Sequence, residues 1–245
     1  MIWIVLFFII ILVSAVLAFR SMKDYEEFPG SENINSLFFV ANSQNFTENS
    51  LKKLHKAFLN SKQFFSLERL NKGQERVLVI FGPREIPEIL PELKLVEIED
   101  YLADPNSLEQ NNMDKKVSVN HALTWLIEGK LNKKPLHIGE ELKNLDLGKD
   151  QQFHIQIVAI PEAAITDLEK FQSTIRVMVV EDDSIERVAL AKILTQGLEQ
   201  ATGFNRHQDN FPEQKKFESF KQRSLVPKEV TPFSLSCQEI YALLA

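Results

Sequence analysis

The stretch "IRVMVVEDDSIERVALAKIL" (residues 175–194) predicts the central strand and helix of the chain's second half. An apolar run of strand length is followed by three consecutive acidic residues, and a helical pattern begins after them. Asp183 predicts an N-cap, and Glu186 three residues later predicts a capping box. Both carboxylates would also face the positive end of the helix dipole. We therefore expect a strand and then the most strongly predicted helix of the soluble part, over residues 184–202.

The same acids are also typical of the start of a phosphorylation-dependent receiver domain, where an acidic pair holds Mg²⁺. A receiver needs a phosphoacceptor aspartate at the end of its third strand, but the corresponding segment, "SLVPKEV" (residues 224–230), has none. The rest of the chain leaves no room for a later lysine-bearing strand. The strand is also not the first of its unit, because "FHIQIVAI" (residues 153–160) precedes it. We therefore interpret the acids as a helix cap.

The N-terminal end is strongly apolar. "IWIVLFFIIILVSAVLAF" (residues 2–19) contains no charge, and its length fits a membrane-spanning helix of about 18–20 residues. A cleaved signal peptide is the alternative, because Val16 and Ala18 form a small-residue pattern. The segment lacks a basic start, however, and its apolar run is longer than signal peptides usually have. We predict a transmembrane helix over residues 1–19.

The charges around this segment predict its orientation. Only the α-amine is basic before it, whereas Arg20 and Lys23 follow it. The positive-inside rule then places the soluble region in the cytoplasm, with a single pass through the cell (inner) membrane. The single cysteine, Cys237, agrees with this location, because a reducing compartment needs no disulfide.

The soluble part divides into two predicted modules in an α+β fold class. Residues 20–35 are polar and form a juxtamembrane linker. Residues 36–104 contain, in order, a strand, a helix, two strands joined by a turn signal, a short helix interrupted by prolines, and a strand. This β-α-β-β-α-β order predicts a ferredoxin-like module, whose sheet would have one face covered by helices and one open face. Thr47 with Ser50 is one predicted start of the first helix, and Asn49 is the alternative cap.

The remainder predicts a linker and a second, smaller α+β module. Residues 105–150 form the linker and include a predicted helix over residues 119–131, whose apolar side chains follow helical spacing. These are Ala122, Leu123, Leu126, Ile127 and Leu131. Residues 151–245 contain two strands (153–160 and 173–181), the helix over 184–202, a loop over 203–214, and short helices over 215–223 and 236–244.

Composition excludes several function classes. The formal net charge is −6, and the basic pairs are spread along the chain, so we expect no direct nucleic-acid binding. The sequence contains neither the G-x-x-x-x-G-K-[ST] loop nor the G-x-G-x-x-G fingerprint. We therefore expect no nucleotide cofactor.

Metal and nucleophile signals are also weak. The five histidines are isolated along the sequence, and one cysteine cannot complete a zinc site with them. His154 is expected to be a hydrogen-bonded or exposed strand residue, and Cys237 a small buried hydrophobe. We therefore expect no catalytic, cofactor-binding or metal-ligating residues and no cofactor. An enzyme of unrecognised type would need His154, Gln156, Arg176 and the acids at 181–183 to converge, which requires the strands near 153 and 174 to pair.

A succession of segments, more than any single motif, resembles a known family. These segments are "VEIEDYLAD" (96–104), "HALTWLIEGKL" (121–131), "HIQIVAIPE" (154–162), "IRVMVV" (175–180), "TGFNRHQDNF" (202–211) and "FSLSCQEIYALL" (233–244). Their order resembles the membrane-anchored N-terminal region of DNA-translocating ATPases related to type IV secretion and conjugation. The ATPase motor of that family has no counterpart in this sequence. The resemblance implies a stand-alone anchoring or adaptor module without catalytic residues.

These observations lead to one preferred function and one alternative. The preferred function is a single-pass, non-enzymatic anchoring or adaptor module of a membrane protein assembly for secretion or DNA transfer. It would attach to the membrane through residues 2–19 and bind a protein partner, such as a separate P-loop ATPase. The alternative is a membrane-tethered ligand-sensing or regulatory module that uses the open face of the sheet.

Overall fold

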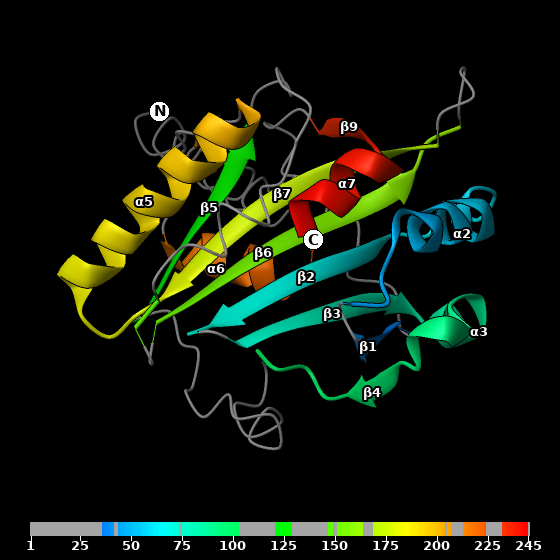
Figure 1. Ribbon diagram of the computed structural model, residues 1–245, viewed down its shortest axis with the longest axis horizontal. Coiled ribbons are helices and arrows are strands. Elements are labelled where there is room, and N and C mark those ends of the chain that lie inside the picture. The colour runs from blue at the N-terminus through cyan, green and yellow to red at the C-terminus, as the bar shows by residue number, and fades with distance from the viewer. Residues whose placement is uncertain are drawn as a thin grey trace, which may run out of the picture.

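A computed structural model describes ten stretches of the chain, which form an α+β fold (Figure 1). The described residues are 36–41, 44–73, 75–102, 121–128, 147–148, 151–163, 169–203, 205–206, 213–223 and 232–244. The predicted transmembrane helix (1–19) and the predicted juxtamembrane linker (20–35) lie outside them, as does most of the predicted linker over residues 105–150. Within these stretches, no helix is long and apolar enough to cross a membrane.

Nine strands and five α-helices make up the described fold. The strands are β1 (Ser36–Ala41), β2 (Phe65–Lys72), β3 (Glu75–Pro83), β4 (Val96–Ile98), β5 (Ala122–Glu128), β6 (Gln152–Pro161), β7 (Lys170–Val180), β8 (Asn205–Arg206) and β9 (Phe233–Ser236). The helices are α2 (Glu48–Phe58), α3 (Ile86–Ile89), α5 (Ser184–Thr202), α6 (Glu213–Lys221) and α7 (Cys237–Leu244), with a 3-10 turn, η1 (Pro91–Leu93).

All nine strands belong to one sheet. Its order is β4-β1-β3-β2-β6-β7-β5-β8, and β9 pairs with β7 beyond the end of β5. Every strand pair within the described residues is antiparallel. Strand β2 of the first predicted module pairs with β6 of the second, from Phe65↔Ala159 to Lys72↔Gln152. The strands of both modules therefore form a single sheet.

Local signals in the sequence account for the main helix boundaries. Thr47 is the N-cap of α2, and its backbone N–H donates to Ser50 Oγ at 3.3 Å. Pro87 and Pro91 limit the next predicted helix to the single turn of α3 and the 3-10 turn η1. Helix α5 covers the predicted range and ends at Gly203, whose φ of 78° favours glycine.

The predicted helix over residues 119–131 is wrong, because β5 occupies this segment. Strand β5 lies between β7 and β8 in the sheet, and both α5 and α6 pack against it. Trp125 and Ile127 are buried on one face, and Ala122, Thr124 and Leu126 are buried on the other. A short apolar run that is buried on both faces shows no alternation, so periodicity cannot distinguish such a strand from a helix.

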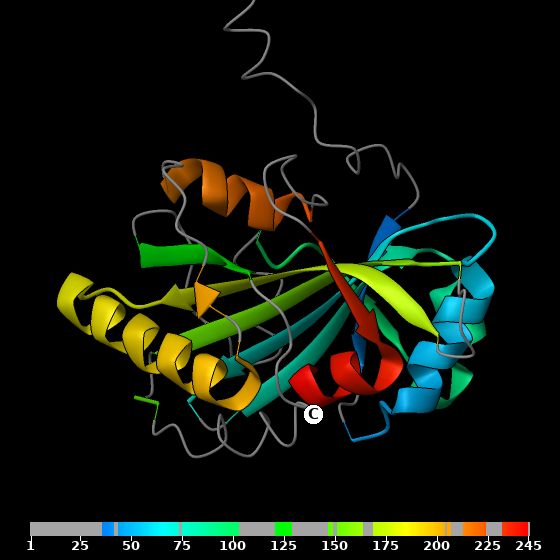
Figure 2. The same cartoon turned by 90° about the horizontal axis from the view of Figure 1, so that it is seen from above.

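The sheet has two covered faces. Figure 2 shows α2, α5 and α7 on one side of the sheet, which we call the first face, and α6 on the opposite side, the second face. The first face carries the main core, to which α5 contributes Leu190, Leu194 and Leu198. The second face carries a smaller apolar cluster that includes Phe217 and Phe220 of α6. Helices therefore cover parts of both faces of the sheet. The sheet expected for the first module has one open face instead.

Candidate functional site

A row of polar side chains crosses the middle of the second face. Glu68 on β2 lies opposite Gln156 on β6, and Gln156 lies opposite Arg176 on β7. All three side chains are at most 1 % exposed. The Gln156 amide donates through Nε2 to Glu68 Oε1 at 3.1 Å and accepts at Oε1 from Arg176 Nη1 at 3.1 Å. The glutamine thus links a buried carboxylate to a buried guanidinium.

Arg223, just after α6, makes the strongest contacts with this row. Its Nε donates to Glu68 Oε1 at 3.0 Å, and its Nη1 and Nη2 donate to the two oxygens of Asp100 at 2.9 and 3.1 Å. The guanidinium carbon lies 4.3 Å from the centre of the Phe38 ring, which is a cation–π contact. Arg223 adopts a φ of 50°, in the left-handed region, so the backbone turns sharply where this side chain enters.

Two hydroxyl groups also donate hydrogen bonds to Glu68. Ser66 Oγ donates to Glu68 Oε1 at 2.5 Å, and the Tyr101 hydroxyl donates to Glu68 Oε2. We call the whole group the second-face cluster. Its members are Ser66, Glu68, Asp100, Tyr101, Gln156, Arg176 and Arg223. Two carboxylates and two guanidiniums give it no net charge, which suits a site with almost no access to water.

Burial and pairing shift the pKa values of the cluster in opposite directions. Burial by itself raises the pKa of Glu68, but the charge and hydrogen bonds of Arg223 outweigh it and lower the pKa below the usual value. Burial lowers the pKa of Arg176 to about 9. Burial and the neighbouring Glu68 carboxylate raise the pKa of Tyr101. Glu68 is therefore ionised and saturated with donors, which makes it a poor general base.

The cluster also holds α6 against the sheet. Gln156 Nε2 donates to the Phe220 carbonyl at 2.9 Å, and Arg223 Nη1 donates to the Lys221 carbonyl. At the other end of α6, Glu213 Oε2 accepts from the Thr124 backbone N–H at 3.4 Å. The polar row thus connects β2, β6 and β7 with α6 and with the turn at Asp100–Tyr101.

His154 lies next to this row and has no hydrogen-bond partner. Its side chain is 1 % exposed, and neither Nδ1 nor Nε2 has a partner in the described structure. Burial lowers its pKa to about 4, so the imidazole is neutral. The expectation of a hydrogen-bonded or exposed histidine is therefore wrong. No group of three or more candidate metal ligands occurs among the described residues either.

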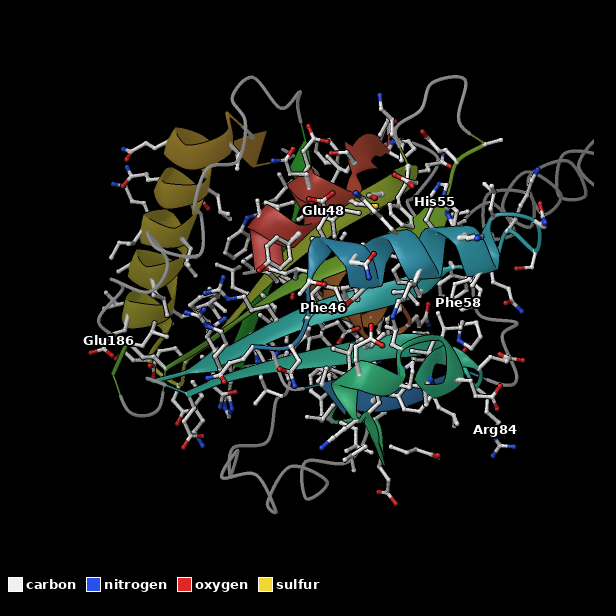
Figure 3. The ribbon with its side chains drawn as sticks, turned by 45° about the vertical axis from the view of Figure 1, so that its right-hand side comes forward. Phe46, Glu48, His55, Phe58, Arg84 and Glu186 are labelled. Atoms are coloured by element: carbon white, nitrogen blue, oxygen red, sulfur yellow. The ribbon has the colours of Figure 1, made fainter. Side chains whose placement is uncertain are left out.

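Glu181 and Asp183 serve α5 instead of the cluster, and Asp182 Oδ1 lies 3.5 Å from His121 Nδ1. Asp183 Oδ1 accepts from the backbone N–H groups of Ile185 and Glu186 at 2.7 and 3.1 Å, which confirms the predicted N-cap. The reciprocal bond comes from Glu181, whose Oε1 accepts from the Asp183 N–H at 3.3 Å. Figure 3 shows Glu186 at the start of α5, away from the sheet. The capping box predicted for Asp183 and Glu186 is therefore wrong in its second half, because Glu181, which precedes the cap, accepts from the Asp183 N–H in place of Glu186.

The strand pairing needed for convergence of the predicted polar residues is present, but only part of the group comes together. Strands β6 and β7 pair, which places Gln156 beside Arg176 and next to His154. Residue 181 lies five positions beyond Arg176 along the chain, about 17 Å at strand spacing.

Cys237 is buried, as predicted, and burial raises its pKa to about 12. The thiol is therefore protonated near neutral pH.

Sequence reasoning missed Glu68, Tyr101, Asp100 and Arg223. Glu68 and Arg223 are 155 positions apart in sequence, and no local motif connects them. The available signal was the charged pair within the strand "QFFSLERL" (residues 63–70), where Glu68 interrupts an otherwise apolar run.

No protein-family model matches the chain, and no curated protein shows significant similarity to it.

Proposed function

We propose that the chain is a single-pass, membrane-anchored, non-enzymatic module that binds a protein partner through the outer face of α5. This face consists of Ile185, Val188, Ala189, Lys192 and Ile193. Ile185 is 78 % exposed, Val188 59 % and Ile193 50 %. Contiguous apolar side chains on a polar surface are typical of interaction sites. The exposure of these three residues is the observation that carries the proposal.

The position of α5 supports this role. The helix lies at one end of the sheet, and its opposite side is anchored in the first-face core by Leu190, Leu194 and Leu198 (Figure 1). Apolar residues therefore occur on both sides of the helix, whereas a surface helix usually keeps a polar outer side. A partner can therefore bury this mostly apolar outer face without any rearrangement of the fold.

The arrangement of the polar side chains favours binding over catalysis. The ionisable groups that converge, Glu68, Arg176 and Arg223, are fully buried and bonded to one another. A substrate would have to displace α6 to reach them. The resemblance to the N-terminal region of type IV secretion-related ATPases adds the expectation of a separate P-loop ATPase as the partner.

The membrane part of the proposal rests on the sequence. The uncharged run over residues 2–19 and the following Arg20 and Lys23 support a single pass, with the described domain on the cytoplasmic side of the inner membrane.

A ferredoxin-like fold for residues 36–104 is supported by the order of the elements along the chain, which is β1, α2, β2, β3, α3 and β4. The strand order in the sheet, β4-β1-β3-β2, also supports it.

Site-specific crosslinking tests the outer face of α5. The native Cys237 is buried and its pKa is raised, so a Val188→Cys variant of the full-length protein presents one reactive thiol. In native membranes we expect a thiol-directed photocrosslinker at this position to yield one discrete protein adduct. The double variant Ile185→Ser/Ile193→Ser in the same background should lose the adduct and keep its native circular dichroism spectrum.

Lys56→Cys is the matched control, because Lys56 is exposed on α2, at the other end of the molecule. This position should give no adduct. Equal labelling from both positions, or an adduct that survives the double variant, would contradict a specific site on α5.

The ligand-sensing alternative predicts a different result. It relies on an open sheet face, and α6 covers part of that face. A small molecule that raises the unfolding temperature in a thermal-shift screen, with no protein adduct at Val188, would favour it.

A further inference from the structure

His154 is a buried imidazole for which the fold supplies no hydrogen-bond partner. A neutral imidazole has one donor nitrogen and one acceptor nitrogen, and buried polar groups are nearly always paired. In the described structure both ring nitrogens of His154 are unpaired. An imidazolium would have two unpaired donors and a charge at the same place, which burial disfavours far more strongly. The site thus accepts the neutral ring and disfavours the charged one.

The side chains around His154 belong largely to the elements that cover the second face. The Tyr101 ring centre lies 5.8 Å from the imidazole, and the Phe220 ring centre of α6 lies at 6.4 Å. Across the sheet, His154 lies opposite Leu70 on β2 and Met178 on β7. The ring is therefore enclosed between apolar strand positions and the covering helix.

The charged groups near His154 are already engaged. Glu68 and Asp100 both accept from Arg223, and Glu68 also accepts from Ser66, Tyr101 and Gln156. Arg176, two residues along β7 from the position opposite His154, donates to Gln156. The Glu68 carboxylate favours protonation of the His154 imidazole, and the Arg223 guanidinium opposes it. A proton on His154 therefore gains no new partner while the second face stays closed.

We propose that His154 is an acid-sensitive latch: its protonation releases α6 and the Asp100–Leu102 turn from the second face while the first-face core stays folded. The released part would be α6 and Arg223, with Tyr101 and Leu102 of the turn. These elements are attached through the second-face cluster, a small apolar cluster and the Thr124–Glu213 contact, whereas α2, α5 and α7 belong to the separate first-face core. The latch is independent of the outer face of α5.

The direction of the pH effect follows from linkage. An imidazole released into water has a pKa near 6.5, whereas burial lowers the value for the closed form to about 4. Above pH 6.5 the ring is neutral in both states, so pH has no effect on opening. Between pH 6.5 and 4 only the open state binds a proton, so opening becomes up to about tenfold more favourable for each pH unit. Stability of the closed second face is therefore lost as the pH falls.

Hydrogen exchange at two pH values tests the latch on the full-length protein in detergent. After correction for intrinsic exchange rates, we expect the protection of α6 amides to fall about tenfold between pH 7.5 and 5.5. Peptides from α2 and β6 should keep their protection. In His154→Leu, which removes the titrating group, the protection of α6 should not change between the two values. Unchanged α6 protection in the wild-type protein, or an equal fall in His154→Leu, would overturn the proposal.

His55→Leu is the matched control, because His55 is also buried but lies on α2, where its Nε2 contacts the Glu162 carbonyl at 3.2 Å. This variant should keep the wild-type response of α6. If His154→Leu does not fold, nitrogen NMR of the wild-type imidazole still decides the matter. A ring that stays neutral in the closed protein at pH 5.5 supports the latch, and one that titrates near pH 6.5 in the closed protein rejects it.

Discussion

The two faces of the sheet bind their covering elements by different interactions. On the first face, α2, α5 and α7 are packed through a continuous apolar core that includes Leu54, Leu194 and Leu243. On the second face, α6 and the Asp100–Leu102 turn lie over a small apolar cluster and a buried row of charges. Apolar packing depends little on protonation, whereas a buried ion pair depends on every member keeping its charge. We therefore expect mutation or a fall in pH to open the second face more readily than the first.

The largest effect is expected from Arg223→Met. The variant leaves Glu68 buried without its guanidinium, which should reduce the free energy of unfolding by about 3–5 kcal/mol. Urea denaturation followed by circular dichroism measures the change. The double variant Glu68→Gln/Arg223→Met should recover part of the loss, because the fully buried Glu68 charge is gone, whereas Asp100 still lacks its guanidinium partner. A loss below about 1 kcal/mol in the single variant would mean that the pair contributes little.

A smaller effect is expected on the first face from Gly82→Ala. A methyl group at Gly82 would lie 2.7 Å from Ile86 Cδ1 and 2.9 Å from Phe65 Cβ, so the neighbouring side chains must shift. Overpacking of this kind costs about 1–3 kcal/mol. The same denaturation experiment measures it. Gly197→Ala in α5 is the control, since a methyl group there meets nothing within 4 Å and should stabilise the helix by up to about 1 kcal/mol. Equal effects from both variants would contradict tight first-face packing.

The smallest effect is expected at the start of α5. Asp183→Ala removes the side chain that caps two backbone N–H groups, which should cost about 1 kcal/mol. Glu186→Ala leaves both cap bonds in place and should cost only about 0.5 kcal/mol or less. Thermal unfolding of the two variants in parallel gives the difference. A larger loss for Glu186→Ala would restore the capping box predicted from the sequence.

Local signals predicted much of the fold. Thr47, Asp183 and Gly203 start or end helices through contacts with residues at most four positions away, so sequence alone could locate them. The β5 segment could not be assigned in this way, because its faces are both buried by elements that are distant in sequence. Glu181 is an intermediate case: it lies next to the cap, but its bond to the Asp183 N–H requires the strand to end at Val180.

Only part of the candidate site could be predicted from the sequence. Gln156 and Arg176 belong to strands that the sequence predicts, and their pairing was stated as the condition for convergence. Glu68 and Arg223 could not be connected, since their contact depends on the β2–β6 pairing and on the position of the chain after α6. The absence of a partner for His154 depends on three separate elements and has no sequence signal.

The sequence by itself determined the class of the fold, most helix ends and the strongly apolar N-terminal run, because each follows from residues that are close together in the chain. The tertiary structure decided that the strands form one sheet, that residues 122–128 are a strand and that Glu68, Gln156, Arg176 and Arg223 form one neutral cluster. The physical reason is that burial and charge pairing depend on distances through space, and in this protein the paired charges are brought together by strand registers and by a helix more than a hundred residues away.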